Sequence, residues 1–175
     1  MPKLIPELQE KFIAAARKRI FDGESGKMTI RQIASDCGTA AGTVYNYFPS
    51  KQLLIAAVIQ EDWDRCIQQM DIHIETAQTA MDGLQGICAA LRIFTIQHSL
   101  FWDHYGGSRI TRGKLTSYHH QVINQIELPV RALLERFDLL FDPCLSMVVA
   151  EILLLAARSD HGFSLVKPAV NKLLS

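Results

Sequence analysis

Apolar residues recur along this 175-residue chain at the three- and four-residue spacing of an α-helix in almost every segment. The resulting stripes lie within residues 12–21, 59–74, 84–95, 122–137 and 145–156. No segment alternates apolar and polar residues for long, as a half-buried β-strand would. The sequence therefore predicts an all-α protein.

Residues that favour helix ends predict where the first helices begin and end. Pro6 suits the first turn of a helix, because its missing N–H would have no partner there in any case, and the turn-forming run 22–26 ends that helix. Thr29 and Thr39 are placed to cap two short helices, with Gly38 in the turn between them. Three short helices are therefore expected before residue 49.

A long fourth helix is expected to follow, since Pro49 closes the third helix and Ser50 can cap a helical pattern that continues to about Ile74. Pro129 interrupts a second long pattern, from about 111 to 138, and is expected to kink that helix. Further breaks are predicted at Gly106-Gly107, at Asp142-Pro143 and at Asp160-His161-Gly162.

These boundaries divide the chain into two expected domains, a small helical module over residues 1–48 and a larger helical body over residues 49–175. No Gly- or Ser-rich linker separates them, because the long fourth helix starts directly after the module. A movement of the body can therefore be transmitted to the module through this helix.

The segment from residue 29 to residue 54 reads TIRQIASDCGTAAGTVYNYFPSKQLL. It contains two short apolar helix edges, and Gly38 between them allows a tight turn. The packing residues are Ile30, Ile33 and Ala34 in the first helix and Val44 and Phe48 in the second. Two short helices joined by a glycine-containing turn predict a helix-turn-helix motif over residues 29–48.

The same segment resembles the DNA-binding domain of the TetR family of bacterial transcriptional repressors. The family pattern is a threonine-capped helix ending in glycine, a helix with Gly-Thr-hydrophobic-Tyr-x-Tyr/His-Phe, and a turn with Ser-Lys opening the fourth helix. The matching residues are Thr29, Ile33, Ala34, Gly38, Gly42, Thr43, Val44, Tyr45, Tyr47, Phe48, Ser50, Lys51 and Leu54. The resemblance is specific over residues 5–58, and beyond them only the helical layout is compatible.

The resemblance implies that the second short helix, about residues 40–48, enters the major groove of DNA. Tyrosine and threonine hydroxyls and Lys51 would contact phosphate, Gly42 would let the backbone approach closely, and Asn46 could bind an adenine edge. The implied DNA-binding residues are Thr29, Arg31, Thr39, Ala40, Ala41, Gly42, Thr43, Tyr45, Asn46, Tyr47 and Lys51.

Positive charge is scarce where DNA is expected to bind. The chain has 18 basic and 18 acidic residues, although its first 52 residues hold eight basic and five acidic ones. No lysine or arginine lies between Arg31 and Lys51. Ala40 and Ala41 stand where many family members have a serine and a lysine, and a methyl group can contact thymine but donates no hydrogen bond. Other candidates for phosphate contacts are Lys3, Lys27 and the run Arg17-Lys18-Arg19.

The resemblance also implies that the helical body binds a small-molecule effector. The run QHSLFWDHYGG, residues 97–107, brings aromatic and histidine side chains together, which suits a ligand pocket but suits a core and its rim equally. The candidate effector-binding residues are Phe94, His98, Phe101, Trp102 and Tyr105.

The run PCLSMVVAEILLLAA, residues 143–157, is apolar nearly all round apart from Ser146 and Glu151. Such a helix must be covered on two sides, either as a central core helix or with one face against its own subunit and the other against a second copy. The second alternative, together with a terminal helix over about 164–174, resembles the dimer of the family. Its candidate interface residues are Leu145, Val148, Val149, Ile152, Leu153, Leu155 and Ala156. A two-fold dimer predicts a palindromic operator.

Other classes of protein are disfavoured by the sequence. The four cysteines lie far apart without a CxxC pair, and the adjacent His119 and His120 would point about 100° apart on a helix, so no metal site is expected. No nucleophile stands beside a base, so we expect neither an enzyme nor a cofactor. Neither a signal peptide nor a membrane-spanning run is visible, which predicts a cytoplasmic protein without membrane contact.

Together these features predict a homodimeric, DNA-binding transcriptional repressor. Its expected partners are a double-stranded DNA operator and an unidentified small-molecule effector that releases the protein from the operator. The alternative is a DNA-binding regulator whose helical body is controlled by a protein partner and not by a small ligand.

Overall fold

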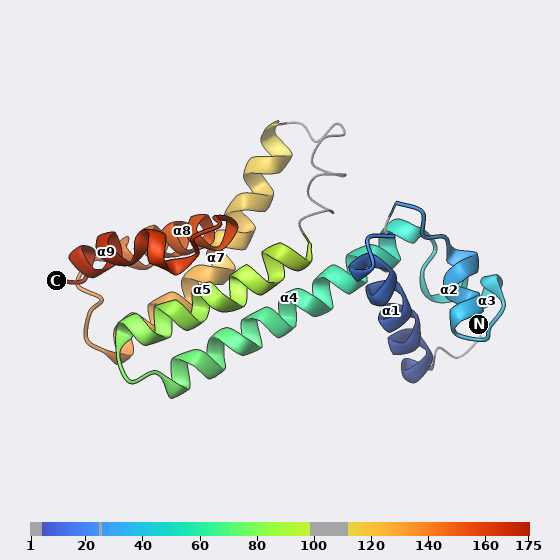
Figure 1. Ribbon diagram of the computed structural model, residues 1–175, viewed down its shortest axis with the longest axis horizontal. Helices are drawn as coiled ribbons and strands as arrows, with labels where there is room; N and C mark the ends of the chain where they lie inside the picture. Colours follow the sequence, from blue (N-terminus) through green and yellow to red (C-terminus); the bar gives the residue numbers. More distant parts are fainter. Residues whose placement is uncertain (1–4, 25, 99–111) are drawn as a thin grey trace. The chain divides into compact units, whose positions relative to one another are not determined.

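Helices form the regular secondary structure of the computed structural model, which describes residues 5–24, 26–98 and 112–175 and has no strand in these ranges. In chain order (Figure 1) they are α1 (Pro6–Phe21), α2 (Ile30–Asp36), α3 (Ala41–Tyr47), α4 (Lys51–Thr76), α5 (Ala80–Gln97), α7 (Arg112–Arg136), α8 (Leu145–Arg158) and α9 (Phe163–Leu173). The predicted all-α fold with an N-terminal helix-turn-helix and a helical C-terminal part is confirmed.

The chain divides into two compact units, Met1–Trp63 and Asp64–Ser175. Helix α4 begins in the first unit and ends in the second. Within the ranges described, no helix combines the length and the apolar content needed to cross a bilayer.

Several predicted helix ends in the first unit are confirmed. Pro6 occupies the first turn of α1. Thr29 caps α2: its Oγ1 accepts a hydrogen bond from the backbone N–H of Gln32 at 3.3 Å, and the Gln32 side chain accepts one from the N–H of Thr29 at 2.9 Å. Gly38 has φ +65° in the turn between α2 and α3, a conformation that residues with a side chain rarely adopt. Ser50 accepts a bond from the N–H of Leu53 at 3.2 Å and so caps α4.

The prediction that Thr39 caps α3 is wrong. The N-cap residue is Ala40, whose side chain has no oxygen to accept a hydrogen bond. The Thr39 hydroxyl instead turns back and lies 3.5 Å from the backbone oxygen of Ala34, near the end of α2. Its geometry therefore closes the turn and leaves the start of α3 uncapped.

The first unit has a compact apolar core built from all of its helices. Side chains that are at most 5% exposed include Phe12 from α1, Ile33 from α2, Val44 and Phe48 around α3, and Leu54 from α4. Complete burial of each such side chain stabilises the fold by about 1.5 to 3 kcal/mol. This core fixes α2 and α3 against α1, so the outer face of α3 is held in a defined position.

The second unit packs α5, α7 and α8 around a shared core. Leu91 of α5, Leu133 of α7 and Leu153 of α8 have no exposed surface. Gly86 of α5 permits one close approach, because a Cβ added there would lie 2.4 Å from Cγ of His73 in α4. Pro129 lies inside α7, which continues on both sides of it, and the expected kink stays a prediction.

The turn between α4 and α5 was not predicted. Thr79 caps α5 by accepting a hydrogen bond from the N–H of Asp82 at 3.2 Å. The guanidinium of Arg136 on α7 donates to the backbone oxygens of Ile74 and Ala77, the latter at 3.1 Å, and so satisfies carbonyls at the end of α4.

The predicted breaks at 142–143 and 160–162 are confirmed, and the one at 106–107 lies outside the described residues. Arg92 of α5 holds the corner between α8 and α9 by donating to the carbonyls of Ser159 and Asp160. Gly162 follows with φ +56°. The corner therefore depends on one arginine and one glycine.

Candidate functional site

Helices α2 and α3 lie side by side in the first unit and form the helix-turn-helix (Figure 1). Val44 on the inner face of α3 is completely buried, whereas Gly42, Tyr45 and Asn46 are exposed. These three residues are spaced three and four apart, so they share one outward face. We call Gly42, Tyr45 and Asn46 the α3 outer face.

Tyr47 is fixed between α3 and α1. Its hydroxyl oxygen accepts a hydrogen bond from the backbone N–H of Ile5 at 2.8 Å, and its ring meets the edge of Phe12 with centroids 5.5 Å apart. The residue is half-buried. Its hydroxyl hydrogen can still be donated to a phosphate oxygen, so these contacts orient the group without using its donor.

Lys51 and Thr29 are already engaged within the first unit. The ammonium of Lys51 donates to the backbone oxygen of Gly26 at 3.2 Å, and the Thr29 hydroxyl donates to Oε1 of Gln32 at 3.0 Å in addition to capping α2. An ammonium has three hydrogens, so Lys51 can bind a phosphate without losing this contact. Thr29 would have to exchange a bond to do the same.

The remaining predicted DNA-binding residues surround the α3 outer face. Arg31 on α2 and Ala40 are exposed, while Thr39, Ala41 and Thr43 are half-buried. Arg31 and Lys51 are the cations among the eleven predicted contacts. The surface of α3 itself has no charged side chain.

Two of the suggested flanking cations are held by carboxylates. Arg17 donates to Glu61 at 2.6 Å and to Asp62 at 2.7 Å, joining α1 to α4, and the side chain of Asp62 is only 5% exposed. We call this set the Arg17 ion cluster. Burial disfavours the charge on Arg17, but the hydrogen bonds and attraction of the two carboxylates outweigh this effect and raise its pKa.

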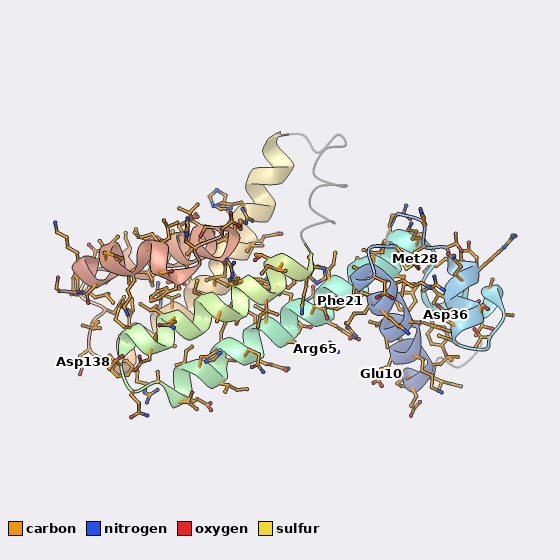
Figure 2. All side chains as sticks on the ribbon, in the orientation of Figure 1. Glu10, Phe21, Met28, Asp36, Arg65 and Asp138 are labelled. Atoms are coloured by element: carbon orange, nitrogen blue, oxygen red, sulfur yellow. The ribbon has the colours of Figure 1, made fainter. Side chains whose placement is uncertain are left out.

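Arg19 also has two acidic partners. It donates to Asp36, which ends α2 (Figure 2), at 2.6 Å, and to Glu24 at 2.8 Å. The hydrogen bonds from Arg19 lower the pKa of Asp36. Arg17 and Arg19 therefore hold the first unit together. These contacts were not predictable from the sequence, because Asp36, Glu61 and Asp62 are 17 to 45 residues away from the arginines that they bind. Lys3 lies outside the described residues.

Phe94 and His98 are the predicted effector-binding residues that the structure describes. Both are buried on α5 and its C-cap, and their rings lie 4.8 Å apart. Phe101, Trp102 and Tyr105 lie outside the described residues. The structure thus brings one aromatic and one histidine ring together inside the second unit.

The seven predicted dimer residues lie on two different faces of α8. Four of them are buried within their own chain: Leu145, Val149, Leu153 and Ala156. Val148 and Leu155 are 44% and 62% exposed, Ile152 is half-buried, and the neighbouring Met147 is 49% exposed. We call Met147, Val148, Ile152 and Leu155 the α8 outer stripe.

A buried polar cluster between α7 and α8 was not predicted. Glu127 is 8% exposed and accepts hydrogen bonds from Ser146 at 2.6 Å and from Arg131 at 2.8 Å. Burial would raise the pKa of Glu127, but these hydrogen bonds and the charge of Arg131 keep it below its ordinary value. The four-residue spacing of Glu127 and Arg131 and the polar Ser146 in an apolar helix were the available signals.

The cysteines and histidines form no recognisable chemical centre in the described residues. All four cysteines are free thiols, and burial raises the pKa of Cys66 to about 12 and that of Cys88 to about 11. No group of three or more potential metal-binding side chains occurs in the described ranges. His119 instead lies 2.9 Å from Glu151 of α8.

Known proteins share the architecture of this chain. The family model described as bacterial regulatory proteins, tetR family, matches residues 12–58. No curated protein matches the chain.

Solved structures resemble the whole chain. A transcriptional regulator from Cytophaga hutchinsonii is 17% identical with a TM-score of 0.68, covering 94% of this chain and 93% of its own. A tetR-family regulator from Streptomyces coelicolor is 18% identical with a TM-score of 0.66, covering 98% and 80%. FadR from Bacillus subtilis, solved in complex with stearoyl-CoA, is 16% identical with a TM-score of 0.60, covering 94% and 96%.

The family model covers the helix-turn-helix and the first turns of α4, and the solved structures share the fold over both units. The sequence motif and the fold of the whole chain agree. Residues 12–58 of this chain thus match the DNA-binding domain of the tetR family of bacterial regulatory proteins, and the whole chain shares the fold of the solved transcriptional regulators.

Proposed function

We propose that the protein is a homodimeric repressor that binds a palindromic operator through two copies of α3 and leaves it when a small molecule enters the second unit. The observation that carries this proposal is the α3 outer face, which a packed helix-turn-helix leaves exposed among the residues that the structure describes. The Tyr47 hydroxyl and the Lys51 ammonium are oriented beside it by Ile5 and Gly26.

Dimer formation is supported by the α8 outer stripe. Four apolar side chains on one exposed face of a helix lose contact with water if a second copy covers them, which stabilises association by about 25 cal/mol per Å² of apolar surface. On α9, which packs against α8, Leu165 is also 49% exposed. A two-fold dimer would present two α3 helices to successive major grooves.

Control by a small molecule is supported by Phe94 and His98, which place an aromatic and a polar ring together in the interior of the second unit. Because α4 belongs to both units, a change at one end of this helix can alter the other. The effector must bind the non-DNA-binding conformation more tightly, since equal affinity for both conformations would release nothing. Acyl-CoA is the first compound class to test, because the similar FadR structure holds stearoyl-CoA.

The deciding experiment measures binding of the full chain to DNA from upstream of its own gene, at several salt concentrations. We expect specific binding that the double variant Tyr47→Phe/Lys51→Ala weakens at least tenfold. Its circular dichroism should match that of the original chain, and its melting temperature should fall only slightly, because the variant loses the hydrogen bonds to Ile5 and Gly26. The slope of log affinity against log salt should be well below ten per dimer, because each neutralised phosphate contributes about 0.9 and α3 has no cation. Unchanged affinity of the double variant would refute the proposed placement of α3.

A second measurement tests release. Stearoyl-CoA, palmitoyl-CoA and free coenzyme A are added to the protein–DNA complex. Release by an acyl-CoA but not by coenzyme A supports an acyl-CoA effector. If none of the three releases the DNA, this effector class is wrong and other small molecules or a protein partner must be screened.

A further inference from the structure

Two residues at the start of α3 are unfavourable for the stability of this helix. Ala40 is the N-cap, a position where Ser, Thr, Asp or Asn stabilises a helix more than alanine does. Gly42 lies inside the helix, where glycine is less favourable than alanine. Both choices weaken a helix of only seven residues.

Neither choice is explained by packing within the first unit. A Cβ added at Gly42 would have no atom within 4 Å, and the residue is in a helix, not in the left-handed conformation that favours glycine. Ala40 is exposed, so a larger polar residue would also fit there. A residue that is unfavourable for its helix, and that no contact within the protein explains, is expected where the surface binds another molecule.

The side chains around Gly42 define what that surface can recognise. Guanine in the major groove is most often bound by arginine or lysine, and α3 contains neither. Asn46 is exposed and has the donor and acceptor pair that matches N7 and N6 of adenine. The methyl group of Ala40 matches the 5-methyl group of thymine. Arg31 lies on α2, the helix that crosses the phosphate backbone in this motif.

We propose that α3 recognises A·T base pairs at the centre of each operator half-site, with Asn46 binding the adenine edge and Ala40 contacting a thymine methyl. Gly42 lies beside Asn46 on the α3 outer face and lets the helix approach the base pairs closely. This inference rests on the proposed function, since it assigns a base preference to the DNA-binding surface described above. Ala40, Gly42 and Asn46 thereby determine specificity, while Tyr47 and Lys51 supply affinity that does not depend on sequence.

The first test is selection of binding sites by the full chain from a pool of random DNA duplexes. We expect A·T pairs at the half-site positions where Asn46→Ala changes the selected sequence. Changing that A·T pair to G·C should weaken DNA binding by the original chain at least tenfold. The same change should weaken binding by Asn46→Ala less than threefold. Asn124→Ala, which changes an exposed asparagine on α7, is the matched control and should select the original sequence.

The second test removes single methyl groups from both partners. Deoxyuridine in place of the contacted thymidine should weaken binding of the original chain about fourfold, the value of one buried methylene-sized group. The same change in DNA should not affect Ala40→Gly, a variant whose helix start is at least as stable because glycine is a better N-cap than alanine. This double substitution separates a direct methyl contact from an indirect effect on DNA shape.

The outcomes distinguish the inference from the proposed function. Selection of G·C pairs at the positions sensitive to Asn46, or equal loss with deoxyuridine for the original chain and Ala40→Gly, would overturn the base assignment while DNA binding stands. Failure of the full chain to enrich any sequence would overturn both.

Discussion

Helices α3 and α8 both leave part of their surface without partners in the described chain, but the two surfaces differ in chemistry. The α3 outer face is small and uncharged, with one glycine, one tyrosine and one asparagine. The α8 outer stripe is apolar, with Leu155 62% exposed, and the exposed Glu151 stands on the same face of the helix. A hydrated polyanion with polar base edges suits the first surface, whereas only another apolar surface suits the second. The two surfaces should therefore respond to different substitutions.

The largest expected effect concerns the α8 outer stripe. Leu155→Glu would place a charge against the same charge of a two-fold partner and remove apolar contact, so the dimer dissociation constant should rise at least 100-fold. Sedimentation equilibrium measures this change. Ile93→Glu on α5 is the matched control, because Ile93 is 58% exposed and lies on another helix. If both variants associate like the original chain, the stripe is not the dimer surface.

The second prediction concerns the Arg17 ion cluster, which joins α1 to α4 in the first unit. Arg17→Met leaves the buried carboxylate of Asp62 without its guanidinium partner and should lower the free energy of unfolding of the first unit by about 2 to 3 kcal/mol, less than a fully buried pair because solvent reaches Arg17. Urea denaturation followed by circular dichroism measures it. Arg19→Met, which breaks an exposed cluster, should have a much smaller effect. Similar losses for the two variants would contradict the assigned role of burial.

The third prediction concerns the buried Glu127 between α7 and α8. Its folded-state pKa is depressed, so the native state takes up its proton less readily than the unfolded chain, whose glutamate titrates near pH 4.3. The stabilisation by the ionised group is present above this pH and is lost as the pH falls through the lower, folded-state pKa. Glu127→Gln should therefore cost about 1 kcal/mol at pH 7 and progressively less below pH 4. Urea denaturation at pH 7, 5 and 3.5 tests this. If the stability lost by Glu127→Gln grew as the pH fell, the direction of the pKa shift assigned to Glu127 would be wrong.

The sequence determined more of the fold than of the site. Periodicity and end signals such as Thr29, Gly38 and Ser50 predicted the helices because these signals act within four residues. The exposed alanine cap at Ala40 was not predicted, because the Thr39 hydroxyl had two local partners available and bonded backwards to α2.

Long-range polar contacts were not predictable from one sequence. The sequence made Arg17 a candidate for phosphate binding, but in the structure Glu61 and Asp62 of α4 bind its guanidinium. On α8 the apolar pattern indicated two covered faces, yet it could not separate Leu153, which its own chain buries, from Leu155, which is exposed. Positions that depend on which neighbour is packed where need the three-dimensional structure.

The smallest expected effect compares two glycines. Gly42→Ala should raise the free energy of unfolding by about 0.5 to 1 kcal/mol, because the added Cβ meets nothing and the unfolded chain loses freedom. DNA binding should nevertheless weaken, since the methyl group would stand between α3 and the base pairs. Gly86→Ala is the matched control, and it should destabilise the protein by about 1 to 3 kcal/mol because its Cβ would lie 2.4 Å from Cγ of His73. Denaturation and DNA titration of both variants test this. A Gly42→Ala protein that is more stable and binds DNA as before would show that no base pair approaches this position, whereas weaker binding in a more stable protein can only arise at the DNA surface.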